Sequence, residues 1–364
     1  MIHFRASLRT LAFTLLALAV LAQVSGAAAS TLNQNASWTI DRAGSTTKFR
    51  SVAYGDSIYA GYNGSVTSAA KYAAPTVNAE YLSAQWGANI ESVRRTKSGA
   101  VASDVYNNKI VAERSYMQAS NTRVVTFEMC GNDGLQARSA FKSQTGTCDY
   151  SGMTAAENSC RTYVTAAMDY INANAYPGVK LKVVSNLHYP GYAVDNAQSS
   201  CKDAGTGATV KMQDRFLPSL ARMNFMMCDV ARQKGFTCAD NFAQYMGADY
   251  DGNGDGVVDS DGLRYVAGET QASYVTRITS TLRSTIRDAN THFVSSGSSY
   301  DYIQSDDTHP TYNGSTLTSG LFGSTTGSGA ARYASFSDGK SPIWNQYGHE
   351  RIGWAVSTYN PAAP

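Results

Sequence analysis

An excess of charge of either sign is what this sequence lacks most clearly. Only 16% of its 364 residues are charged, and 30 Lys and Arg stand against 28 Asp and Glu. So small a balance argues against nucleic acid or an anionic membrane as the main partner. Proline is scarce, at 8 residues, and 43% of the residues are hydrophobic. Low charge combined with this apolar fraction argues against disorder and predicts a folded core.

Apolar runs long enough to cross a membrane are missing after the first thirty residues. Before that point, two arginines flank the start of an uncharged apolar run at 10–22, and small residues follow as far as Ala29. This order is typical of a Sec-type secretory signal peptide, and the run is shorter than the ~20 residues that a membrane span needs. We therefore predict a bacterial signal peptide at 1–29. Residues 30–364 are expected to form one domain, secreted or periplasmic, monomeric and without a transmembrane segment.

Pairs of the form C-x-x-C are also absent, which argues against a zinc ribbon or a thioredoxin-type site. An even number of cysteines in an exported chain predicts three disulfides. Six cysteines permit 15 connectivities, and the sequence does not choose among them. We favour local closures, with the pairs Cys148–Cys160, Cys228–Cys238 and Cys130–Cys201.

Short apolar or β-branched runs alternate with longer amphipathic patterns along the chain. The strands are expected at 48–53, 123–129, 179–187 and 236–239. The helices are expected at 69–86, 155–175, 210–234 and 271–293. Such alternation predicts an α/β fold with a parallel sheet covered on both faces. Ligands of such sheets bind at the carboxyl ends of the strands, so the loops that follow them are the candidate sites.

Two of these loops carry chemistry-bearing turns. The first strand runs into Gly55-Asp56-Ser57, where a serine on a tight turn is a candidate nucleophile. The G-x-S-x-G elbow of α/β-hydrolases is excluded because position 59 is Tyr. The second loop contains Asn132, within Gly-Asn-Asp, and an Asn amide can donate to a developing oxyanion. Between the two lies Gly99, within Ser-Gly-Ala, where a backbone N–H could approach a ligand closely. Each turn alone also describes an ordinary surface turn.

A histidine near the C-terminus completes the set. Asp306 precedes His309 by three residues, and a carboxylate so placed can orient an imidazole while its other nitrogen faces a serine. His188 is the only rival, and the lack of a nearby acid favours a place in the pocket wall. His292 lies in a predicted helix, and His349 is expected at a helix start.

Taken in order, Gly-Asp-Ser, Ser-Gly-Ala, Gly-Asn-Asp and Asp-x-x-His-Pro resemble the four blocks of the SGNH, or GDSL, hydrolase family. The resemblance spans residues 51–354 and implies a three-layer α/β/α flavodoxin-like fold with about five parallel strands. It also implies a serine esterase or lipase that needs no cofactor for catalysis and forms an acyl-enzyme. The implied catalytic residues are Ser57, Asp306 and His309, and the implied oxyanion hole comprises Ser57, Gly99 and Asn132.

Two departures from the family pattern affect the pocket. Ile58 stands where the family usually has leucine, and the segment between Pro310 and Gly348 is longer than the family minimum. Tyrosines near the predicted strand ends suit a sugar face as well as an acyl chain. The expected substrate is a lipid or short-acyl ester. The alternatives are a carbohydrate esterase that deacylates a polysaccharide, and a non-catalytic glycan-binding module.

An acidic insertion at 249–262 forms a second, independent feature. Counted from Asp251, its spacing follows an EF-hand loop, although position twelve is Gly262 rather than the usual Glu. Clustered carboxylates repel one another unless a cation lies between them. We therefore expect a structural calcium ion, with the ligands Asp251, Asn253, Asp255, the Val257 carbonyl, Asp259 and Asp261.

The calcium expectation predicts that the melting temperature rises with calcium and falls when EDTA removes it. Magnesium at the same concentration is the control, because it accommodates a large oxygen cage poorly. A melting temperature that is the same in calcium and in EDTA would contradict this expectation.

Overall fold

A computed structural model describes residues 33–65, 67–189, 195–246, 261–285, 303–304, 306, 308–318 and 347–364. The predicted signal peptide lies outside these residues, as do five of the six predicted calcium ligands. The sixth, Asp261, begins a short 3-10 helix, η2 (Asp261–Leu263).

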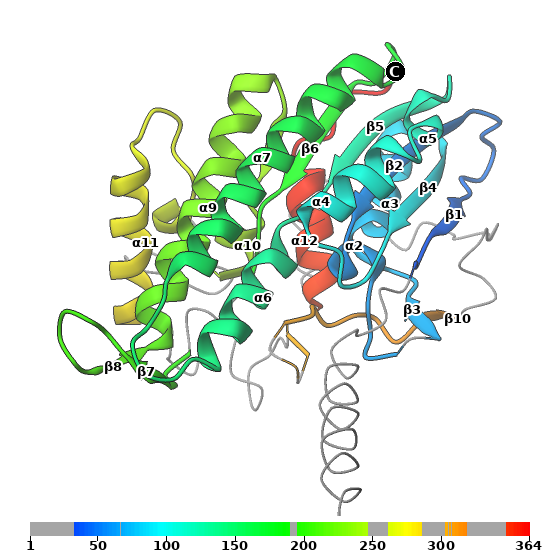
Figure 1. The fold of residues 1–364 in the computed structure, drawn as a ribbon. Coiled ribbons are helices and arrows are strands. Elements are labelled where there is room, and N and C mark those ends of the chain that lie inside the picture. Colours follow the sequence, from blue (N-terminus) through cyan, green and yellow to red (C-terminus); the bar gives the residue numbers. More distant parts are fainter. Residues whose placement is uncertain are drawn as a thin grey trace, which may run out of the picture.

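The centre of the fold is a six-stranded sheet with the order β1-β4-β2-β5-β6-β9 (Figure 1). Five neighbouring strands are parallel, and only the edge strand β1 runs antiparallel, against β4. Numbered along the chain, the parallel strands have the order 2-1-3-4-5, which is the flavodoxin-like order. The predicted fold class is therefore confirmed. The strands are β1 (Ala36–Ile40), β2 (Lys48–Gly55), β4 (Asn89–Thr96), β5 (Thr122–Phe127), β6 (Leu181–Ser185) and β9 (Thr237–Ala239).

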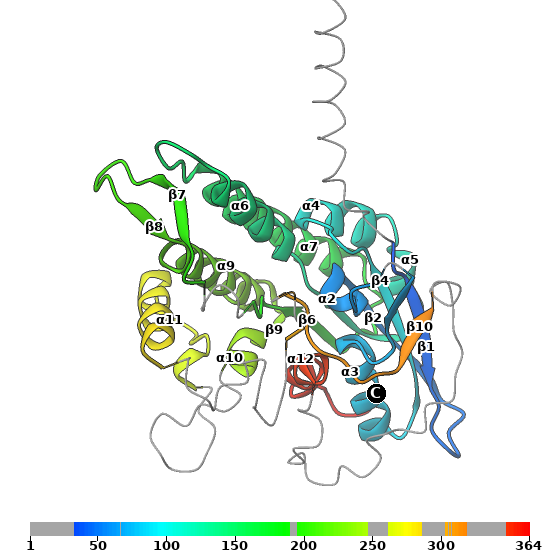
Figure 2. The ribbon, with the colours of Figure 1, turned by 90° about the horizontal axis from the view of Figure 1, so that it is seen from below.

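Helices cover both faces of the sheet (Figure 2). Side chains alternate along β2, so Val52 and Tyr54 join the large core on one face, whereas Ala53 packs on the other. The large-core face carries η1 (Val105–Val111, a π-helix), α6 (Gly131–Lys142), α7 (Ser151–Asn174) and α9 (Met212–Lys234), with α11 (Gln271–Thr285) packed on α9. The opposite face carries α3 (Ala74–Trp86) and α12 (Gly348–Ser357), whereas α10 (Asn241–Met246) packs on α12 and places Phe242 and Ala243 in the large core.

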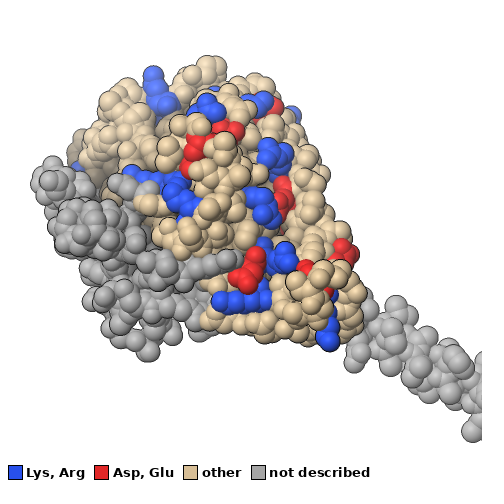
Figure 3. All heavy atoms as spheres, turned by 90° about the vertical axis from the view of Figure 1, so that its left-hand side faces the viewer, with Lys and Arg blue, Asp and Glu red and all other residues tan. Residues whose placement is uncertain are grey.

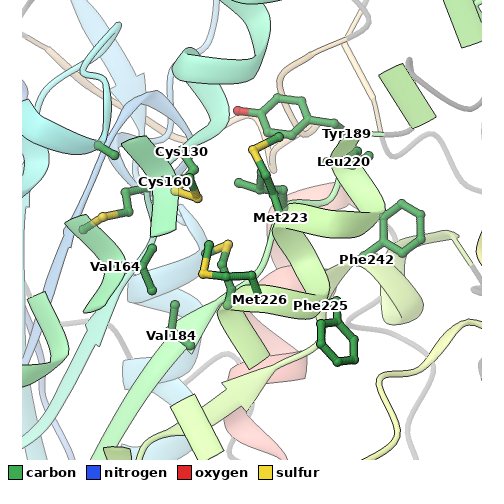
Figure 4. Close-up of a cluster of buried hydrophobic side chains, with 14 of the residues drawn as sticks. Cys130, Cys160, Val164, Val184, Tyr189, Leu220, Met223, Phe225, Met226 and Phe242 are labelled. Atoms are coloured by element: carbon green, nitrogen blue, oxygen red, sulfur yellow. A yellow bond between two sulfur atoms is a disulfide. The ribbon is translucent and has the colours of Figure 1, made fainter. Parts of the chain in front are cut away.

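The large core lies between the sheet and the pair α7 and α9. Figure 4 shows Val184 of β6, Val164 of α7 and Met226 of α9 converging, with the disulfide between Cys130 and Cys160 beside them. Unbranched methionine side chains fill irregular gaps between helices and sheet. Short elements complete the chain: α2 (Ser57–Ala60), β3 (Ser68–Ala70), α4 (Ala102–Asp104), α5 (Ser115–Gln118), β7 (Gln198–Lys202), β8 (Thr209–Lys211) and β10 (Thr316–Thr318).

Several elements differ from the sequence expectations, and for two of them, β4 and α3, the physical reason is clear. β4 was not expected, because its sequence is polar and includes Glu91, Arg94 and Arg95. These charges are accommodated: Glu91 pairs with Arg50 at 2.9 Å, and Arg94 is fully buried against backbone carbonyls. The helix expected at 69–86 begins only at Ala74, because the residues before it form β3.

The disulfides correct two of the three expected pairs. The structure joins Cys130 to Cys160, Cys148 to Cys201 and Cys228 to Cys238, so only the last expected pair is confirmed. The pair Cys148–Cys160 was wrong because α7 starts at Ser151 and carries Cys160 away along its axis at ~1.5 Å per residue. Instead, the Cys148 N–H bonds the Lys202 carbonyl at 2.9 Å, which places it beside Cys201.

On the face that lies at the left of Figure 1, charges are mixed rather than segregated: basic and acidic side chains are interspersed in Figure 3. Among the helices that the structure describes, none has both the length and the apolarity to cross a membrane.

We predict that the double variant Cys148→Ser/Cys201→Ser loses about 2–4 kcal/mol of unfolding free energy, because a loop of 53 residues is no longer closed in the unfolded chain. Urea denaturation of both proteins measures the loss. Peptide mapping without reduction checks the pairing itself, and recovery of a peptide linking Cys148 to Cys160 would contradict the structure.

Candidate active site

The candidate nucleophile stands where β2 ends and α2 begins. Asp56 caps α2 by accepting the Ile58 N–H at 2.9 Å, and Ser57 is the first helical residue, 7% exposed. Only glycine fits at position 55, two residues before Ser57, because a Cβ there would lie 2.8 Å from the Cβ of Tyr59. Gly61 ends the helix with φ +75°, a conformation that glycine adopts readily. The local sequence thus holds Ser57 on a sharp turn at the carboxyl end of the sheet.

Ser57, His309 and Asp306 form one hydrogen-bonded line. His309 Nε2 lies 2.9 Å from Ser57 Oγ, and His309 Nδ1 lies 2.6 Å from Asp306 Oδ2. A carboxylate oxygen accepts, so the proton resides on Nδ1, and Nε2 accepts from the serine hydroxyl. Partial burial alone would raise the pKa of Asp306, but hydrogen bonds from the His309 side chain and backbone lower it to about 2. Asp306 is therefore ionised at neutral pH.

The chain on either side of His309, here called the histidine segment, is hydrogen-bonded to the residues that follow α2. The Gln304 side chain donates to the carbonyls of Tyr62, at 2.9 Å, and Pro310, at 2.8 Å. The ring of Tyr62 lies 4.6 Å from the His309 ring, centroid to centroid. Downstream, β10 pairs with β3 (Figure 1). The buried Arg94 guanidinium donates to the carbonyls of Ala60, at 3.0 Å, and Ala70, at 2.8 Å, so it fastens β3 to α2.

His188, the rival base, supports the triad rather than replacing His309. Its Nε2 lies 3.0 Å from the Thr308 carbonyl, and because a carbonyl can only accept, Nε2 carries the proton. Burial lowers the pKa of His188 to about 4, so the ring is neutral at physiological pH. His349 is fully buried at the start of α12, which confirms the expected helix start.

Asn132 links the two candidate loops. It lies in the first turn of α6, and its Nδ2 donates to Asp56 Oδ2 at 3.0 Å and to the Ala100 carbonyl at 2.9 Å. Gly99, next to Ala100, has φ +77°. The structure thus brings Asn132 and the Gly99 loop to the turn that carries Ser57. Both amide hydrogens of Asn132 are engaged here, so an oxyanion would have to displace the Ala100 carbonyl.

The Gly99 loop is fixed from two further sides. Asp133, also in the first turn of α6, accepts from the Ala102 N–H at 2.7 Å and from Ser159 Oγ of α7 at 2.8 Å. On the other side, the Thr96 hydroxyl donates to the Gln34 carbonyl at 2.6 Å, just before β1. A rigid loop is what a backbone N–H aimed at a ligand requires.

The entry to α6 has an unusual backbone. Cys130 has φ +85°, the only positive φ among the described residues other than glycine, and its disulfide anchors it to α7. The next residue, Gly131, has no room for a side chain, since a Cβ there would lie 1.8 Å from the Tyr189 hydroxyl. Tyr189 itself stacks on His188, with centroids 4.7 Å apart. Strained positions of this kind concentrate at functional sites.

Sequence reasoning missed several supporting residues. Asp56 was quoted only as part of a turn, and Gln304 carried no signal. Glu128 had one: it is the single charged side chain near the end of an otherwise apolar buried strand, and it is 2% exposed. Within the described ranges no cluster of acidic, His and Cys side chains could hold a metal ion, and the calcium ligands lie outside them, apart from Asp261.

Comparisons with known proteins returned solved structures only, since no family model and no curated protein matches. A lipase from a goat rumen metagenome is 14% identical, with a TM-score of 0.42 over 65% of this chain and 96% of that one. Phospholipase A1 from Streptomyces albidoflavus is 16% identical, with a TM-score of 0.37 over 55% of this chain and 82% of that one. An acetylxylan esterase from Geobacillus stearothermophilus is 14% identical, with a TM-score of 0.34 over 56% of this chain and 80% of that one. Likeness at this level decides nothing about activity, which depends on the site itself.

We predict that Gly131→Ala lowers the unfolding free energy by about 1–3 kcal/mol, because the new methyl group overlaps the Tyr189 ring. Gly152→Ala is the matched control: its Cβ meets nothing within 4 Å near the start of α7, so it should be neutral or slightly stabilising. Equal melting temperatures for the two variants would show that the Tyr189 contact does not restrict position 131.

Proposed function

We propose that this protein is an ester hydrolase of the SGNH type, with Ser57 as nucleophile, His309 as general base and Asp306 as its partner. The observation that carries the proposal is the unbroken hydrogen-bonded line Asp306–His309–Ser57 at the carboxyl end of a parallel sheet. Carboxylate, imidazole and hydroxyl in this order are the groups that acyl transfer by a serine nucleophile requires.

The first chemical step transfers a proton. As Ser57 Oγ attacks the ester carbonyl carbon, its proton passes to His309 Nε2, and the imidazolium that forms is stabilised by the ionised Asp306. The low pKa of Asp306 keeps the carboxylate charged through this step. His309 then gives the proton to the departing alkoxide, which leaves Ser57 acylated. In the second half, His309 takes a proton from water as the water oxygen attacks the acyl carbon. The bond to Ser57 Oγ then breaks, Oγ takes the proton back from His309, and the carboxylic acid leaves.

The negative charge that develops on the ester carbonyl oxygen must be stabilised by hydrogen-bond donors. The backbone N–H groups of Ser57 and Gly99 and the amide of Asn132 are the proposed donors. Asn132 can retain its bond to Asp56 while it gives up the Ala100 carbonyl for the oxyanion. Because the oxyanion is charged and a carbonyl is not, this exchange favours the transition state over the resting state.

The proposed substrate is a lipid or short-acyl carboxylic ester met outside the cytoplasm. Three disulfides are compatible with an oxidising compartment, periplasmic or extracellular. The aromatic face of Tyr62 against His309 borders the nucleophile and suits a sugar ring as well as an acyl chain. An acylated polysaccharide is therefore the second candidate substrate.

The test is a panel of p-nitrophenyl esters of increasing acyl length, with acetylated xylan beside it. We expect turnover by the wild type, none above background by Ser57→Ala, and a loss of about 10²–10³ in kcat for Asn132→Ala, the usual effect of removing one oxyanion donor.

Thr162→Ala, at an exposed position of α7, is the matched control and should keep full activity. Absence of turnover on every ester by folded wild-type protein would refute the hydrolase and favour a glycan-binding module. Full activity of Asn132→Ala would leave the hydrolase standing but remove Asn132 from the oxyanion hole.

A further inference from the structure

A buried acidic side chain, Glu128, lies next to the turn that carries Ser57. Glu128 follows the last residue of β5, is 2% exposed, and has its backbone N–H bonded to the Tyr54 carbonyl of β2 at 3.0 Å. Its side chain reaches the turn before Ser57, where the Asp56 N–H donates to Glu128 Oε2 at 3.4 Å. Gly55 leaves it this space, since a Cβ there would lie 3.2 Å from Oε2.

The contacts of Glu128 do not suit an ionised carboxylate. Its second oxygen, Oε1, is buried and has no hydrogen-bond partner among the described residues. A charged oxygen left without a donor in the interior is costly, whereas a neutral carboxylic acid is much less so. The neighbouring Asp56 is also fully buried, and two adjacent carboxylates repel each other.

One proton resolves the conflict. The two carboxyl groups are close enough to share one proton: their interaction lowers the pKa of Asp56 and raises that of Glu128, which is the direction expected when Glu128 is the protonated partner. Burial is the larger cause for both groups: it raises the pKa of Asp56 to about 6 and that of Glu128 well above its ordinary value. At neutral pH the pair therefore holds one proton, on Glu128, and one negative charge, on Asp56.

The ionised carboxylate of Asp56 accepts two hydrogen bonds that organise the site. Its Oδ1 accepts the Ile58 N–H that starts α2, and its Oδ2 accepts from Asn132 Nδ2 at 3.0 Å. An ionised oxygen accepts more strongly than a neutral one. The Asp56 carboxylate therefore holds the NH2 group of Asn132, rather than its carbonyl oxygen, toward the site. If Asp56 were protonated instead, its hydroxyl would compete with the amide as a donor.

We propose that Glu128 is a positioning residue, which keeps its own proton so that Asp56 stays ionised and holds the Asn132 amide ready to donate to the oxyanion. This role rests on the proposed esterase function. The other titratable groups that face the pair are His309, which favours an ionised Asp56, Asp133, which disfavours it, and the buried Tyr59 hydroxyl beside Glu128.

Two substitutions of similar volume separate this role from simple packing. Glu128→Met fills the space but removes the donor, so we expect a folded enzyme whose kcat falls about 10–100-fold with KM little changed. Glu128→Gln keeps a neutral donor and should restore kcat to within about threefold of the wild type. Glu157→Met and Glu157→Gln, on α7 away from the site, are the matched controls and should leave kcat unchanged.

A double-mutant cycle identifies the residue through which Glu128 acts. In an Asn132→Ala background, Glu128→Met should cost less than about threefold further, because the amide it positions is already gone. A folded Glu128→Met enzyme with wild-type kcat, or full additivity with Asn132→Ala, would overturn the proposal.

If Glu128→Met fails to fold, Glu128→Gln decides: a tenfold loss of its kcat would mean that Glu128 acts as an ion, and a retained kcat would support the protonated pair. A wild type without esterase activity would overturn the proposed function first, and that outcome is distinct from any of these.

Discussion

The two hydrogen bonds accepted by the buried Asp56 carboxylate are the interactions on which the rest of the site depends. One oxygen caps the helix that presents Ser57, and the other accepts from the amide of Asn132, which follows a different strand. Asp56 and Asn132 are 76 positions apart in the sequence, so the alignment of the Ser57 turn with the Asn132 amide cannot be set by local sequence. A shared anion between them sets it instead, because each donor must point at the same small group.

The parallel sheet explains why such an arrangement is possible. β2 and β5 are neighbours in register, Tyr54 beside Phe127, so the turns that follow them leave the sheet at the same edge. The histidine segment comes from a separate part of the chain and reaches that edge through contacts with Tyr62 and, by way of β10, with β3. Each supporting bond ends on a backbone carbonyl or a buried carboxylate, which leaves little freedom for the reacting atoms.

Much of this could be predicted from sequence, and what could not has a physical reason. Four of the five parallel strands were expected from short apolar or β-branched runs. The fifth, β4, was not recognised because its sequence carries charges that the fold pairs or buries, as Arg94 shows. The order of the four motifs identified Ser57, Asn132 and His309 as candidates, and the structure brings them together. Glu128 was missed because its meaning comes from Asp56, a neighbour in space only. Two of the three disulfide pairs were predicted wrongly because loop length ignores the direction in which α7 carries Cys160, whereas the pair Cys228–Cys238 was predicted correctly.

The disulfide between Cys130 and Cys160 shows how the fold tolerates backbone strain at the site. Cys130 takes a left-handed conformation that costs of order 1–3 kcal/mol for a residue with a side chain, immediately before Gly131 and Asn132. Its sulfur is bonded to Cys160, in the part of α7 that packs into the large core. The strained turn is thus fixed to the large core. Because the core cannot yield without opening cavities, the turn cannot relax, and Asn132 stays where Asp56 and Glu128 can hold it.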